Sequence, residues 1–209
     1  MTSLARRERT QLADLLNEVG PDAPTLCGDW TTRDLTAHLI VREGSPAAVG
    51  IAVPQLAGWT EHSRKRTASR DFGDLVKDLR NGPPLWSVMR VPELDKLLNT
   101  VEFFVHLEDV RRAGPDWQPR ELDAADDGAV WKATRARAGM LLRRSRVGVQ
   151  LRTPDGRAAE GRAGSPSVTL VGTPSELLMY LHGRTDNALV EVQGDAEAVE
   201  IFRGTRLTV

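Results

Sequence analysis

A run of polar side chains with metal-binding chemistry lies in the apolar stretch between Asn99 and Arg112. On a helix, Asn99, Glu102, His106 and Asp109 fall within an arc of about 80°. Apolar residues flank that arc on both sides, namely Leu98, Val101, Phe103, Val105 and Val110. A carboxylate placed among them needs a positive partner, because burying an unpaired charge costs several kcal/mol. A divalent metal held by the i, i+4 pair of Glu102 and His106 meets that need, and a hydrogen-bonded Glu–His pair without metal is the alternative.

Two ligands do not make a metal site, so a third must come from another element. Thr31 and Asp34 have the types expected at an N-cap and in a first helical turn, which predicts a helix over 32–43. His38 lies on this helix among apolar neighbours, so its imidazole is expected to point inward. It is therefore either the missing ligand or a histidine that only completes the core.

Cys27 is the single cysteine of the chain, which excludes an internal disulfide and an all-cysteine zinc site. A nucleophilic or metal-ligating role and a role as a buried loop thiol beside Trp30 are both open, and we favour the loop thiol.

The totals indicate a globular chain large enough to bury a core. It has 209 residues, 40% hydrophobic content and a formal net charge of −1. No apolar run reaches the length of a membrane span and no leader is recognised, so we expect a cytoplasmic protein without a membrane partner. The segment 132–162 is rich in Lys and Arg but lacks interleaved aromatics and a groove-reading motif, which favours a solvated surface over nucleic-acid binding.

The hydrophobic spacing predicts a mainly α chain with an α+β part, divided into residues 1–115 and 116–209. The expected helices of the first part span 2–19, 32–43, 71–80 and 92–113, with an interrupted helical segment over 44–70 and a linker around 85–89. Four main helices in this length predict a bundle. The second part is expected to hold helices at 126–143, 174–182 and 195–202, strands at 147–152, 157–162, 167–171 and 188–192, and a possible edge at 207–209.

Two segments resemble a known family. The run Cys27-Gly-Asp-Trp-Thr-Thr-Arg-Asp-Leu-Thr-Ala-His38-Leu is similar to the Gly-Trp-x-x-x-Asp-Leu-x-x-His signature of the mycothiol-dependent maleylpyruvate isomerase N-terminal domain, with Asp29 inserted. This domain is a DinB-like metal-binding four-helix bundle. The stretch from Asn99 to Arg112 resembles the second metal segment of the family. The resemblance implies a divalent ion, of the zinc type, held by His38, Glu102 and His106.

The C-terminal half resembles the sterol-carrier-like α+β domain that accompanies the bundle, through Leu170 to Leu178 and the Gly183-Arg184 pair. His182 stands where family members often carry an aromatic residue. An arginine of this domain is implicated in catalysis in the family, which makes Arg184 the candidate here. A helix C-terminal arginine that only compensates the helix dipole is the alternative.

Three protein ligands leave an open position, as in catalytic zinc sites, and a bound ion lowers the pKa of a thiol. We therefore expect a metal-dependent enzyme that uses a low-molecular-weight thiol, mycothiol, as cosubstrate for isomerisation or for S-transfer to a small electrophile. Asn99 and Asp109 are candidates for supporting the ligands or orienting the substrate, or they only satisfy neighbouring groups. The rival is a non-catalytic metal-binding protein whose C-terminal domain holds an apolar ligand or a partner. A monomer and a homodimer are both open.

Overall fold

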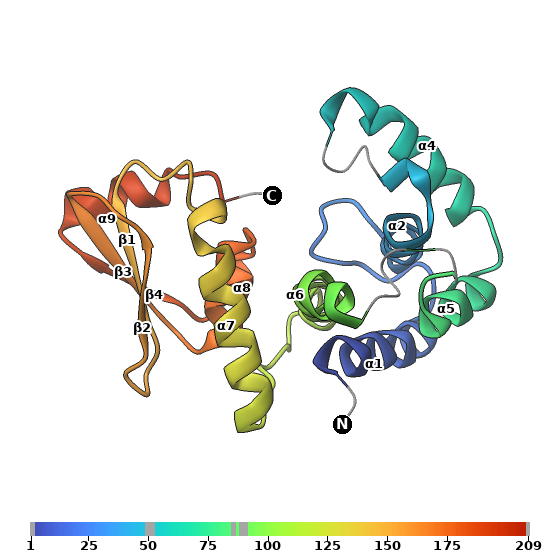
Figure 1. The fold of residues 1–209 in the computed structure, drawn as a ribbon, viewed down its shortest axis with the longest axis horizontal. Coiled ribbons are helices and arrows are strands. Elements are labelled where there is room, and N and C mark those ends of the chain that lie inside the picture. The colour runs from blue at the N-terminus through green and yellow to red at the C-terminus, as the bar shows by residue number, and fades with distance from the viewer. Residues whose placement is uncertain (1–2, 49–52, 85–86, 88–91, 208–209) are drawn as a thin grey trace. The chain divides into compact units, whose positions relative to one another are not determined.

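A computed structural model describes residues 3–48, 53–84, 87 and 92–207 of the chain (Figure 1). It divides into two compact units, residues 1–118 and 119–209. Among the described residues, no helix is both long enough and apolar enough to cross a membrane. The chain is mainly helical, with a four-stranded sheet in its C-terminal part, which confirms the expected fold class at this level.

Four helices of the first unit share one hydrophobic core. These are α1 (Leu4–Val19), α2 (Thr32–Gly44), α5 (Phe72–Asn81) and α6 (Pro92–Arg111), which end within two residues of the predicted limits. Each contributes an apolar stripe, and the buried side chains are Leu12, Ala13, Leu16, Leu35, Leu39, Val76, Leu79, Phe103, Leu107 and Val110. The packing explains why these amphipathic segments are stable as helices.

The segment between α2 and α5 contains two short 3-10 turns, Pro46–Ala48 and Pro54–Leu56, and then α4 (Ala57–Ala68), which packs against α2. The interruption before α4 agrees with the prediction, although residues 49–52 lie outside the described part. Most of the predicted linker around 85–89 also lies outside it.

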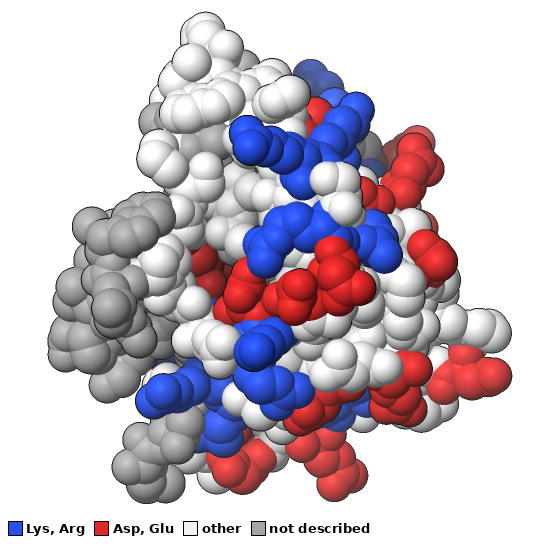
Figure 2. Space-filling model, turned by 90° about the vertical axis from the view of Figure 1, so that its right-hand side faces the viewer, with Lys and Arg blue, Asp and Glu red and all other residues white. Residues whose placement is uncertain are grey.

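Lys and Arg side chains are interspersed with Asp and Glu on the face of the molecule in Figure 2, which is typical of a solvated surface.

The second unit packs three helices with a sheet in the order β2-β1-β3-β4. The helices are α7 (Ala124–Leu141), α8 (Pro174–Leu181) and α9 (Ala196–Arg203), and the strands are β1 (Gly148–Arg152), β2 (Ala158–Arg162), β3 (Ser167–Val171) and β4 (Glu191–Gly194). β1 pairs antiparallel with β2 and parallel with β3, and β4 pairs antiparallel with β3. Side chains from all three helices join the core of this unit.

The prediction for the last strand was wrong by three residues, because β4 begins at Glu191 rather than at Ala188. A 3-10 turn over Thr185–Asn187 comes first, and the Leu189 N–H then donates to the Glu176 carboxylate at 2.7 Å. Because the Leu189 N–H bonds a side chain, it does not join the sheet, and β4 begins at Glu191, which pairs with Val171 of β3. Leu207, expected at an edge strand, instead packs into the core outside any strand, and residues 208–209 lie outside the described part.

Candidate metal centre

The start of α2 is fixed by the capping residues that the sequence predicted. Thr31 is the N-cap, its hydroxyl accepts from the Asp34 N–H, and the Asp34 carboxylate accepts from the Thr31 N–H at 3.2 Å. This capping box sets where the helix begins, and therefore which face carries His38 and Arg42, one turn apart.

The side chain of Glu102 on α6 contacts this face of α2. The Glu102 Oε1 lies 3.3 Å from His106 Nε2 on the same helix and 3.6 Å from His38 Nε2. One oxygen or nitrogen from each of the three residues lies within 4.8 Å of the others. Their side chains are 13–19% exposed, so the cluster is largely buried. The structure thus brings together the three residues named from the sequence.

Arg42 is the residue that the sequence analysis missed. Its Nε lies 3.1 Å from Glu102 Oε1, so the positive partner demanded by a buried carboxylate is a side chain of the chain itself. Arg42 also donates to Asn99 Oδ1 at 2.6 Å, and the Asn99 amide donates to Glu43 at 2.8 Å. Asn99 therefore supports Arg42 rather than the imidazoles. The i, i+4 spacing of His38 and Arg42 places both on one face of a helix, and this spacing could have indicated that Arg42 lies beside the cluster.

Asp109 lies on the far side of the His106 ring from Glu102 and is fully buried. Its Oδ2 is 2.9 Å from His106 Nδ1 and 3.0 Å from the Cys27 Sγ. An Nδ1–H that donates to Asp109 fixes the ring and turns Nε2 toward Glu102. Cys27 Sγ is 3.7 Å from the same Nδ1, so the thiol lies beside His106, a contact that no local pattern in the sequence predicts.

These contacts shift the ionisation of the three central groups. Burial lowers the pKa of His38, because the charged imidazolium is poorly solvated. Burial alone would raise the pKa of Glu102, but hydrogen bonds from His106 and His38 outweigh it and hold that pKa well below its usual range. Burial alone would lower the pKa of His106, yet the contacts with Asp109, Cys27 and Glu102 raise it well above its usual value.

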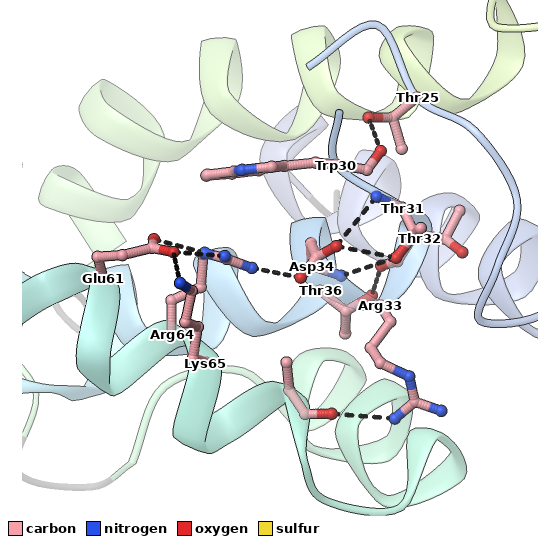
Figure 3. Close-up of polar contacts among 11 residues, drawn as sticks. Thr25, Trp30, Thr31, Thr32, Arg33, Asp34, Thr36, Glu61, Arg64 and Lys65 are labelled. Carbon is pink, nitrogen blue, oxygen red and sulfur yellow. Dashed lines mark hydrogen bonds and ion pairs between the residues drawn. The ribbon is translucent and has the colours of Figure 1, made fainter. Parts of the chain in front are cut away.

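Trp30 forms one wall beside His38, with ring centroids 5.1 Å apart. The Arg64 guanidinium of α4 lies 4.9 Å from the centroid of the Trp30 indole and ion-pairs with Asp34 and Glu61 (Figure 3). A buried arginine held from two sides thus fixes the indole, and the indole limits the freedom of His38.

Arg184 lies in the second unit, after the His182 C-cap of α8 and Gly183, and its guanidinium donates to the His182 carbonyl at 2.6 Å. The His182 imidazole is buried and its Nδ1 lies 2.8 Å from the Leu178 carbonyl. Both side chains thus contact backbone carbonyls at the C-terminal end of α8, and the charge of Arg184 suits the negative end of the helix dipole.

Residues 5–85 match the family model of the mycothiol maleylpyruvate isomerase N-terminal domain. Over these residues the chain is similar to this family. The match confirms the family suggested by the signature around Trp30 and His38. The matched residues end before Glu102 and His106. The assignment of these two residues therefore depends on the geometry of the cluster and on the resemblance of the segment from Asn99 to Arg112. Searches among curated proteins and among solved structures found no match for the chain.

Proposed function

We propose that His38, Glu102 and His106 bind one divalent metal ion, of the zinc type. The donor set suits such an ion, since two imidazole nitrogens and a carboxylate oxygen from two helices converge. The His106 ring supports it further, because Nδ1 is engaged by Asp109 and Nε2 is left to face the centre. The convergence of these three donors is the observation on which the proposal depends.

The proposed activity is the use of a low-molecular-weight thiol, mycothiol, for isomerisation of a small electrophilic substrate or for S-transfer to it. A metal ion bound by three protein ligands supplies an open position and a Lewis acid that lowers the pKa of a thiol. The chain's own residues hold the geometry: Asp109 orients His106, Arg42 pairs with the Glu102 carboxylate, and the Trp30 ring lies against His38. The family match of the N-terminal part supports the choice of thiol.

Two finer assignments belong to the same proposal. The first unit is a DinB-like bundle, supported by its four-helix core and by the family match, and the second unit is a sterol-carrier-like domain, supported by its α+β content.

Arg184 is proposed as the catalytic arginine of the second unit. If it has that role, Arg184→Ala lowers turnover with unchanged metal content, whereas Arg203→Ala at the end of α9 serves as a matched control and leaves turnover unchanged.

The experiment that tests the site is metal analysis of the purified full chain and of three variants. The wild type is expected to carry one divalent ion per chain, while His38→Ala and His106→Ala lose it. His62→Ala is the control, because His62 is exposed on α4. A wild type without stoichiometric ion, or variants that retain it, would reject the site.

Activity is tested next, by incubating the loaded protein with mycothiol and a panel of small electrophiles. Consumption of the electrophile that depends on both metal and thiol supports the enzyme. A loaded protein that stays inactive across the panel favours the second candidate, a non-catalytic metal-binding protein whose C-terminal unit holds an apolar ligand or a partner.

A further inference from the structure

The Cys27 thiol, the His106 ring and the Asp109 carboxylate form a second cluster of ligand atoms behind the first. Sγ to Oδ2 is 3.0 Å, Nδ1 to Oδ2 is 2.9 Å and Sγ to Nδ1 is 3.7 Å. All three atoms lie within 4.8 Å of one another. This cluster uses the opposite nitrogen of His106 from the one that faces Glu102.

The backbone around Cys27 holds the thiol in this place. The Cys27 N–H donates to the Thr25 hydroxyl at 3.1 Å, and the Leu26 N–H donates to the Asp109 carbonyl at 3.0 Å. Gly28, at φ +66°, adopts the left-handed conformation that reverses the loop directly after the thiol. The loop is therefore tied to α6 at the residue whose carboxylate contacts Sγ.

The triangle of ligand atoms already has the size that a tetrahedral ion needs. With metal–sulfur bonds near 2.3 Å and metal–nitrogen and metal–oxygen bonds near 2.0–2.2 Å, neighbouring ligand atoms are separated by about 3.3–3.6 Å. The observed separations of 2.9, 3.0 and 3.7 Å differ from these values by tenths of an ångström. Only small rotations of the side chains separate the hydrogen-bonded triangle from a coordinating one.

The charge of this cluster also suits a divalent cation. A thiolate and a carboxylate together carry two negative charges, equal and opposite to the charge of the ion, so a buried complex is neutral. The His38 cluster offers one carboxylate, which already faces the Arg42 guanidinium at 3.1 Å. A thiolate also prefers soft ions, in contrast to the nitrogen and oxygen donors of the His38 cluster.

We propose that Cys27, His106 and Asp109 form an alternative metal position that takes a thiophilic divalent ion. The neutral His106 ring has one lone pair, on either Nδ1 or Nε2, so an ion at this position excludes an ion at the His38 position. The existence of the Cys27 position stands on its own geometry, and only the exclusion rests on the proposed function. A thiophilic ion is thus expected to displace the ion of the proposed active site and to inhibit it.

Cadmium titration of the full chain tests the proposal through the near-ultraviolet charge-transfer absorption of a metal–thiolate bond. Wild type is expected to develop this band with saturation at one Cd²⁺ per chain. His38→Ala is expected to keep the band, since His38 serves only the other cluster. Cys27→Ser and His106→Ala are expected to lose it, with far-ultraviolet circular dichroism showing that the variants are folded. The serine hydroxyl retains a donor for Asp109, which makes it the conservative replacement.

Alkylation of Cys27 in the unaltered chain gives a readout that needs no variant. At free Cd²⁺ near ten times its Kd, coordination is expected to slow the reaction of Cys27 with iodoacetamide about tenfold, whereas Mg²⁺ leaves the rate unchanged.

Absence of the band, or a band that survives in His106→Ala, overturns the position. Two Cd²⁺ ions bound together overturn the exclusion. A wild type that is purified without a bound ion but still develops the cadmium band would instead reject the proposed function and leave the Cys27 position standing.

Discussion

Replacing Glu43 by glutamine is expected to destabilise the first unit strongly. Glu43 on α2 forms a bidentate ion pair with Arg9 on α1, with both N–O distances 2.5 Å and side chains that are 3% and 6% exposed. The substitution removes the carboxylate charge that faces the Arg9 cation in the core. Breaking a buried pair in this way costs about 3–5 kcal/mol, so we expect a loss of unfolding free energy of about 3 kcal/mol or more.

The chain offers a matched control on α1, the helix that carries Arg9. Arg80 on α5 and Asp14 on α1 also approach to 2.5 Å, but their side chains are 37% and 64% exposed. Solvent screens such a pair, so Asp14→Asn is expected to cost less than about 1 kcal/mol. Hydrogen exchange of the slowest amides of α1 reports the unfolding free energy of this unit alone, which matters because two units need not unfold in one transition.

Equal losses in Glu43→Gln and Asp14→Asn would refute the reasoning, because burial rather than distance is held to set the cost. The double variant Arg9→Met, Glu43→Gln separates the charge from the packing. It is expected to be more stable than Glu43→Gln alone, since the buried cation is removed together with the carboxylate charge that faced it. A double variant less stable than the single one would assign the loss to packing of the Arg9 side chain instead.

Three further outcomes are expected. Gly183→Ala should lower the melting temperature of the second unit far more than Gly156→Ala, because both have positive φ but only at Gly183 would a Cβ meet a backbone oxygen, at 2.2 Å. Burial alone would raise the pKa of Asp34, but hydrogen bonds from Arg64 and Thr31 outweigh it and lower that pKa from 3.8. The carboxylate therefore adds stability above pH 3.8, and this stability is lost as pH falls through the lowered value. In urea titrations the deficit of Asp34→Asn should therefore shrink below about pH 4. Asp109→Asn should weaken Co²⁺ binding to the proposed site about 10- to 100-fold by isothermal titration.

Most elements of the fold follow from local patterns in the sequence. Apolar residues at three- and four-residue spacing mark α1 and α5, and the Thr31 capping box marks the start of α2. The start of β4 did not follow, because it depends on a contact between Leu189 and Glu176, which lies on α8. Such a side-chain contact to the backbone arises only when the helix is already packed.

The candidate site divides in the same way. Helical spacing places Glu102, His106 and Asp109 on one face of α6, so their proximity is predictable from the sequence. The contacts of Arg42 with Glu102, and of Cys27 with Asp109, join segments about sixty or eighty residues apart. They depend on how α2 and the loop before it lie against α6, which hydrophobic periodicity does not specify.

Arg42 changes the argument for a metal ion. A buried Glu102 needs positive charge, and Arg42 supplies it, so electrostatic need alone does not require an ion. The metal-free and metal-bound states differ at His106, whose Nδ1 lies 2.9 Å from Asp109 Oδ2 and whose Nε2 lies 3.3 Å from Glu102. A lone pair on Nε2 would repel the carboxylate, so without an ion this nitrogen must carry a proton, in agreement with the raised pKa of His106. An ion between Nε2 and the carboxylate replaces that proton, and metal binding at this site is therefore expected to release it to the buffer.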